Sequence, residues 1–158
     1  LDETVDEIIS ERIEILTAIY EEELEVVPGL TPLLDELKLR EYLLAVASSS
    51  PLRVINFVLD MFSLHSYFDA VVSGECTENG KPHPDIYLHT AEVLGVRPSE
   101  CVAIEDSING VRSATGAGMY CIAIPDKRLS PEAFERAHLI LENMDELKPQ
   151  FFDTFNPV

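Results

Sequence analysis

The sequence is poor in basic residues, and this shortage argues against several classes of partner. Only 11 lysines and arginines stand against 29 aspartates and glutamates among 158 residues, so the formal net charge is −18. Proteins that bind nucleic acids or anionic membrane surfaces need a basic footprint, because the phosphates they bind are negatively charged. The composition therefore predicts no nucleic-acid partner and no membrane partner.

Long apolar runs and paired cysteines are missing as well. No apolar stretch approaches the roughly 18 residues that a membrane-spanning helix needs. The sequence has three cysteines, an odd number, and no two of them show a CxxC spacing. This pattern predicts free thiols in a reducing, cytoplasmic environment rather than a disulfide framework.

Several common catalytic motifs are also absent. The chain contains no GxGxxG fingerprint, no GxxxxGK[ST] phosphate loop and no GxSxG nucleophile elbow. Its four histidines show no zinc-protease spacing. A serine hydrolase is therefore not expected, although three consecutive serines occur in the chain.

What the sequence does contain is a regular alternation of amphipathic helices and short apolar runs. The predicted helices cover 4–24, 51–62, 84–94 and 108–117, with a further one after Thr31 that includes Leu33, Leu34 and Leu37. The predicted strands cover 42–47, 70–72, 101–104, 120–124 and 139–141. Thr31 is expected to cap the second helix. The alternation predicts an α/β fold, a three-layer, Rossmann-like parallel sheet with helices on both faces.

Ligands of such sheets bind at the carboxyl ends of the strands, and three predicted strands end in polar residues. The first ends at Ser48, Ser49 and Ser50, directly before a helix. A hydroxyl beside the free N–H groups of a helix start is typical of an anion site of phosphate size. The same pattern fits a serine that only caps the helix, and both interpretations stay open.

A lysine lies before the fourth helix. Lys81 belongs to the segment GKPHPD at 80–85, where a glycine and a proline constrain its backbone. A cation is unfavourable near the positive N-terminal end of a helix, so a lysine in this place indicates a bound anion. An ordinary exposed loop lysine is the alternative.

Two adjacent carboxylates follow the strand predicted at 101–104. Glu105 and Asp106 would repel each other and lose hydration at the end of a buried strand. A hard divalent cation with oxygen ligands, magnesium first, would remove this cost. The alternative is a pair of solvated carboxylates that cap the next helix.

Together, in this order, the three strand ends resemble the haloacid dehalogenase-like superfamily, in the branch that holds β-phosphoglucomutase and small sugar-phosphate phosphatases. The matching segments are ASSS at 47–50, GKPHPDIY at 80–87, IEDSINGV at 104–111 and AGM at 117–119. The resemblance implies that the full-length parent is a Mg²⁺-dependent phosphatase, which acts on a small sugar phosphate through an aspartyl-phosphate intermediate. A phosphohexomutase is the alternative, as is a non-catalytic phosphate-binding module if the chain is natively this short.

The resemblance also implies roles for individual residues. Ser48 would hydrogen-bond the transferring phosphate, and the backbone N–H of Ser49 would join it. Lys81 would bridge the phosphate and the nucleophile. Glu105 and Asp106 would hold Mg²⁺.

One motif of the superfamily has no match in the chain. It is an N-terminal strand that ends in Asp-x-Asp and supplies the nucleophile. Residues 1–26 resemble the last helix and hinge of a helical cap domain, and residues 27–158 resemble the core domain without this strand. We therefore expect that the missing N-terminal segment is needed to complete the fold. Alone, the 158 residues are expected to be inactive and to form no stable closed monomer.

Overall fold

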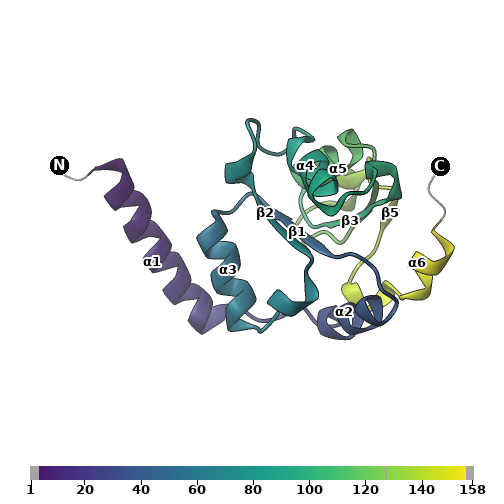
Figure 1. The fold of residues 1–158 in the computed structure, drawn as a ribbon, viewed down its shortest axis with the longest axis horizontal. Helices are drawn as coiled ribbons and strands as arrows, with labels where there is room; N and C mark the ends of the chain where they lie inside the picture. Colours follow the sequence, from purple (N-terminus) through teal and green to yellow (C-terminus); the bar gives the residue numbers. More distant parts are fainter. Residues whose placement is uncertain (1–3, 127, 156–158) are drawn as a thin grey trace.

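A computed structural model describes residues 4–126 and 128–155, in which helices and strands alternate as the sequence predicts (Figure 1). The helices are α1 (Val5–Glu23), α2 (Leu30–Leu39), α3 (Leu52–Met61), α4 (Asp85–Leu94), α5 (Ile108–Gly116) and α6 (Gln150–Thr154). The strands are β1 (Ala45–Ser48), β2 (Ala70–Ser73), β3 (Val102–Glu105), β4 (Tyr120–Ala123) and β5 (Leu139–Ile140).

All strand pairs are parallel, but the strands form two sheets. β1 pairs with β2, placing Ala45 opposite Ala70, and β4 lies between β3 and β5. No ladder joins β1 to β3 within the part of the chain that the structure describes. The α/β class and the parallel strands are confirmed, and the sheet is interrupted between β1 and β3.

Helices cover both faces of the sheets, which gives the three expected layers (Figure 1). α4 and α5 bury Ile86 and Val111 against β3 and β4 on one face. On the other face, α2 packs through Leu33 and Leu37 against Ile122 of β4. α3 packs there as well, burying Ile55 in a cluster that includes residues of β1 and β2.

The first two helices begin in different ways. At α1 the Thr4 hydroxyl accepts the Glu7 N–H while the Glu7 carboxylate accepts the Thr4 N–H, which is a complete capping box. The expectation that Thr31 caps α2 is wrong, because the helix already begins at Leu30. Its N-cap is Gly29, whose φ of +85° is a left-handed conformation that glycine adopts without strain.

α1 stands at the edge of the molecule and contacts α3 (Figure 1). The Arg53 guanidinium of α3 donates to the Ile9 carbonyl of α1 at 3.3 Å. Residues 1–3 of the predicted cap segment lie outside the described residues. Within the described ranges, no helix is both long and apolar enough to cross a lipid bilayer.

The predicted free thiols are confirmed for all three cysteines. Cys76 is exposed, Cys101 is half-buried and Cys121 is buried. Burial, together with the negative charge of Glu105, raises the pKa of Cys121 to about 12. Cys121 is therefore a protonated core thiol at neutral pH.

The C-terminal helix α6 was not predicted from the sequence. The Arg40 guanidinium donates to the Asp153 carboxylate, which ties α6 to the end of α2. Phe152 lies against Tyr42, with a distance of 6.0 Å between the ring centroids. A five-residue helix has too short a pattern to be read from sequence, and these distant contacts hold it in place.

Candidate active site

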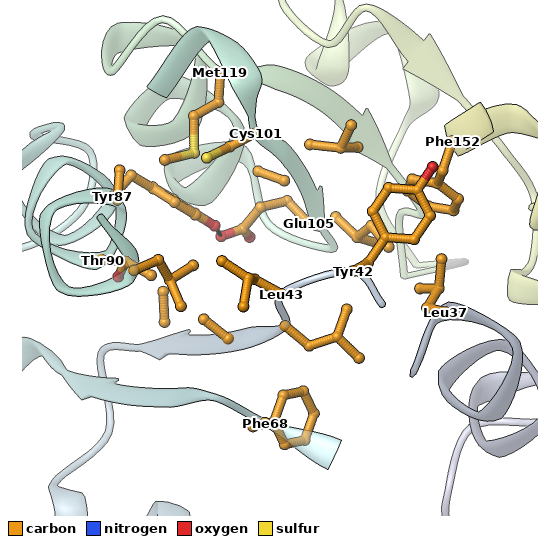
Figure 2. Close-up of a pocket in the computed structure, with 18 of the residues that line it drawn as sticks. Leu37, Tyr42, Leu43, Phe68, Tyr87, Thr90, Cys101, Glu105, Met119 and Phe152 are labelled. Carbon is orange, nitrogen blue, oxygen red and sulfur yellow. Dashed lines mark hydrogen bonds between the residues drawn. The ribbon is translucent and has the colours of Figure 1, made fainter. Parts of the chain in front are cut away.

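A cavity of about 780 Å³ lies at the interruption between β1 and β3. Its wall contains all five residues that the sequence singles out as site residues: Ser48, Ser49, Lys81, Glu105 and Asp106. Ser48 and Glu105 are the last residues of β1 and β3, so both lie at the carboxyl edge of the parallel strands. Much of the remaining wall is apolar (Figure 2).

Lys81 and Glu105 form a buried ion pair at this cavity. The Lys81 Nζ lies 2.5 Å from Glu105 Oε1, and the side chains are only 12% and 6% exposed. The same ammonium donates to the Ala47 carbonyl at 3.2 Å. A buried carboxylate without a partner would cost several kcal/mol, so Lys81 compensates the charge of Glu105. Lys81 also bridges β1 and β3 where no backbone ladder does.

Tyr87 of α4 is a third member of this cluster, and sequence reasoning did not assign it a role. Its hydroxyl donates to Glu105 Oε1, and the two side chains point toward each other in Figure 2. The Lys81 Nζ lies 4.9 Å from the centroid of the Tyr87 ring. Burial, reinforced by the charge of Glu105, raises the pKa of Tyr87 well above its usual value, so the phenol stays protonated as a donor.

Ser48 keeps a donor that can serve a ligand. Its Oγ accepts the Ser50 N–H at 3.2 Å, which leaves the hydroxyl proton free to be donated. Ser50 does not cap the next helix. The N-cap of α3 is Pro51, whose side chain cannot accept a hydrogen bond from the first N–H groups of this helix. The capping alternative for these serines is therefore not what the structure shows.

The N-terminus of α3 is less open than the sequence suggests. The Leu52 N–H donates to the Glu75 carboxylate at 2.8 Å, and Glu75 also accepts from the hydroxyl of Ser73. Sequence reasoning missed Glu75, which lies two residues after the end of β2 and does not line the cavity. Its carboxylate holds the end of β2 against the start of α3.

The Glu105 carboxylate is also fixed from the side of α5. The Ser107 hydroxyl donates to Glu105 Oε2 at 3.2 Å and accepts the Gly110 N–H at 3.0 Å, so Ser107 caps α5. A Cβ on Gly110 would lie 1.8 Å from Glu105 Oε2. Only glycine leaves room for the carboxylate at this position.

Glu105 and Asp106 are a chemically suitable pair for a hard cation. Glu105 is buried whereas Asp106 is exposed, and both line the cavity. Over residues 4–126 and 128–155, no cluster of three or more histidines, cysteines or carboxylates has metal-binding geometry. Magnesium is commonly held by one or two carboxylates, with water and substrate phosphate as the other ligands, so the donor set fits this ion.

A family model of haloacid dehalogenase-like hydrolases matches residues 1–118. The chain belongs to this family. Hexitol phosphatase B of Escherichia coli K12 is 37% identical to it over 142 residues, which are 90% of this chain and 60% of that protein. CbbY of Cereibacter sphaeroides is 36% identical over 130 residues, which are 80% of this chain and 56% of that protein.

Solved structures of haloacid dehalogenase-like proteins show the same fold. CbbY from Rhodobacter sphaeroides in complex with phosphate has a TM-score of 0.84 at 32% identity, covering 92% of this chain and 67% of that one. β-Phosphoglucomutase from Clostridium difficile has a TM-score of 0.82 at 25% identity, covering 95% and 67%. The resemblance to this superfamily is confirmed, and the chain spans about 60% of the length of the two curated relatives named above.

Proposed function

We propose that this chain forms the phosphate-binding and magnesium-binding part of a phosphatase that acts on a small sugar phosphate. The observation that carries the proposal is the buried Lys81–Glu105 pair, set in a cavity that Ser48 and Asp106 also line. The relatives support the substrate class, since one is a hexitol phosphatase and CbbY was solved with xylulose-1,5-bisphosphate.

Three groups of this chain would bind the phosphate. The Ser48 hydroxyl has a free proton to donate, and the Ser49 N–H lies next to it in the chain. The Lys81 ammonium supplies positive charge in a protein whose net charge is −18. Preorganised donors of this kind stabilise the charge that develops on a transferring phosphoryl group.

Glu105 and Asp106 would hold Mg²⁺ at the same edge. Both are oxygen donors, and Glu105 is kept in place by Lys81, Tyr87 and Ser107. When bound, the ion would neutralise negative charge on the phosphate and help to orient it.

The nucleophile of the proposed reaction is an aspartate outside these 158 residues. We infer that it is carried by a further strand, which occupies the cavity between β1 and β3. Two features support this inference: β1 and β3 each lack a ladder partner on the side facing the other, and the cavity between them has an apolar wall. In this proposal residues 1–26 belong to a cap domain and residues 27–158 to the core, and Lys81 would bridge the phosphate and the aspartate.

The test is a panel of sugar phosphates assayed with Mg²⁺, using the protein at its full encoded length. We expect release of inorganic phosphate, and a loss of at least about 100-fold in kcat/KM for Lys81→Ala. Lys38→Ala is the matched control, because Lys38 pairs with Asp69 on the surface, and it is expected to keep wild-type activity.

Three results would count against the proposal. The first is that no sugar phosphate releases phosphate, and the second is that Lys81→Ala keeps full activity. The third is that a sugar phosphate is isomerised and no phosphate is released. The last result would establish the mutase alternative, and tight phosphate binding without turnover would establish a binding module. The 158-residue chain by itself is expected to release no phosphate.

A further inference from the structure

The Glu105 carboxylate has a fixed environment on several sides, and the groups around it differ in kind. One oxygen, Oε1, accepts from the Lys81 ammonium and the Tyr87 hydroxyl, while Oε2 accepts from the Ser107 hydroxyl. The backbone of α5 lies close on a further side, because a Cβ on Gly110 would be only 1.8 Å from Oε2, while the side toward the cavity stays open. Of the three donors, Lys81 is the only cation.

Lys81 and Tyr87 therefore contribute differently. A lysine ammonium is a mobile point charge on a four-carbon stem, and a metal ion at Glu105 would repel it. Tyr87 is neutral and only 7% exposed. Its ring packs in the hydrophobic core together with Ile86 and Ala91 of the same helix, α4. Its hydroxyl can keep its hydrogen bond to Oε1 whichever cation faces Glu105. A carboxylate has about four lone-pair directions, so Oε1 keeps one for a cation while it accepts from Tyr87.

We propose that Tyr87 is a positioning residue, whose hydroxyl orients the Glu105 carboxylate so that a divalent cation can bind it. This inference rests on the proposed function for the metal site. Tyr87 acts through Glu105 and touches neither the phosphate nor the ion. Partners that orient metal ligands in this way typically change metal affinity 10- to 100-fold when they are lost.

The experiment compares Tyr87→Phe with wild type at the full encoded length. Binding of Mn²⁺, as a stand-in for Mg²⁺, is measured directly by electron paramagnetic resonance, and the Mg²⁺ dependence of phosphate release is measured in parallel. We expect the Kd for Mn²⁺ and the Mg²⁺ concentration for half-maximal activity both to rise about 10- to 100-fold. The KM for the sugar phosphate at saturating Mg²⁺ is expected to stay within about twofold, because Tyr87 does not touch the phosphate.

Tyr67→Phe is the matched control. The hydroxyl of the half-buried Tyr67 also donates to a carboxylate, that of Asp35 at 2.6 Å, but neither residue lines the cavity that holds Glu105. This variant is expected to bind Mn²⁺ like wild type. A merely structural role for Tyr87 would instead lower the melting temperature without the metal and leave the Kd for Mn²⁺ unchanged, which would overturn the inference.

The outcomes separate this inference from the proposed function. If wild type hydrolyses sugar phosphates and Tyr87→Phe binds Mn²⁺ equally well, the role of Tyr87 is wrong and the function stands. If wild type binds Mn²⁺ and Tyr87→Phe binds it weakly, but no sugar phosphate is hydrolysed, the role of Tyr87 stands and the function is wrong. If wild type does not bind Mn²⁺ at all, both are wrong.

Discussion

The strands β4 and β1 have the same length, four residues each, and a similar apolar composition, yet their surroundings differ. β4 has a parallel neighbour on each side, and its residues Cys121, Ile122 and Ala123 are completely buried. β1 pairs only with β2, and all four of its residues are half-buried. The difference shows that a continuous apolar run predicts a strand that can be buried on both faces. How far it is buried depends on whether other strands pair with it on both sides.

The open side of β1 is also where the chemistry gathers. Lys81 reaches across to the Ala47 carbonyl of β1 and the Glu105 carboxylate of β3, and so spans the interruption with side-chain bonds. The β4 side of the molecule is held by packing, and the β1–β3 side is held by a charged pair. Mutations should therefore affect the two sides differently.

The largest expected difference in stability comes from two isoleucines of neighbouring strands. Ile122 of β4 is completely buried, whereas Ile104 of β3 is 38% exposed. The β3–β4–β5 side of the 158-residue chain is packed, although the open β1–β3 side is expected to prevent a stable closed monomer. For this packed side, Ile122→Ala is expected to lower the free energy of unfolding by about 2–5 kcal/mol. Ile104→Ala should lower it by roughly 1 kcal/mol, because less apolar surface leaves water on folding. Urea denaturation measures both values.

The same two variants, Ile122→Ala and Ile104→Ala, also test the proposal of a further strand between β1 and β3. At the full encoded length, a strand in the cavity would cover part of β3, and the cost of Ile104→Ala should rise toward that of Ile122→Ala. Equal costs in the 158-residue chain would mean that β3 is already as well packed as β4, and the comparison would fail.

A smaller effect is expected from two glycines of α5. Gly110→Ala would drive a Cβ into the Glu105 carboxylate, and overpacking of this kind costs about 1–3 kcal/mol. Gly116→Ala is the control on the same helix, because its Cβ would meet only the Pro84 Cβ at 3.7 Å. That variant should be neutral, or more stable by up to about 1 kcal/mol, because alanine favours the helix. Thermal unfolding of both variants without metal checks the pair, and equal melting temperatures would show that the carboxylate is not confined.

The sequence carried enough information to place the polar strand ends together. Parallel strands share a carboxyl edge, so Ser48 and Glu105 had to lie at the same edge once the strand order was recognised. Lys81 could be included because its position before a helix is electrostatically unusual. The positions of these residues follow from strand direction and helix charge, without the details of packing.

What the sequence did not reveal are partners that depend on three-dimensional position. Tyr87 occupies an apolar position in the pattern of α4, and nothing in that pattern shows where its hydroxyl points. Glu75 is bound by Leu52, which lies 23 residues earlier in the chain. The start of α2 was placed late, because a glycine N-cap with a positive φ gives no side-chain signal comparable to that of Thr31.

Hydrogen exchange of the backbone amides, measured strand by strand, is the most direct test of a strand missing between β1 and β3. In the 158-residue chain, β1 is expected to exchange at least roughly 100-fold faster than β4, because it has one ladder partner instead of two. At the full encoded length, a strand between β1 and β3 should remove most of this difference. Equal protection of β1 and β4 in the 158-residue chain would contradict the claim that a strand is missing between β1 and β3.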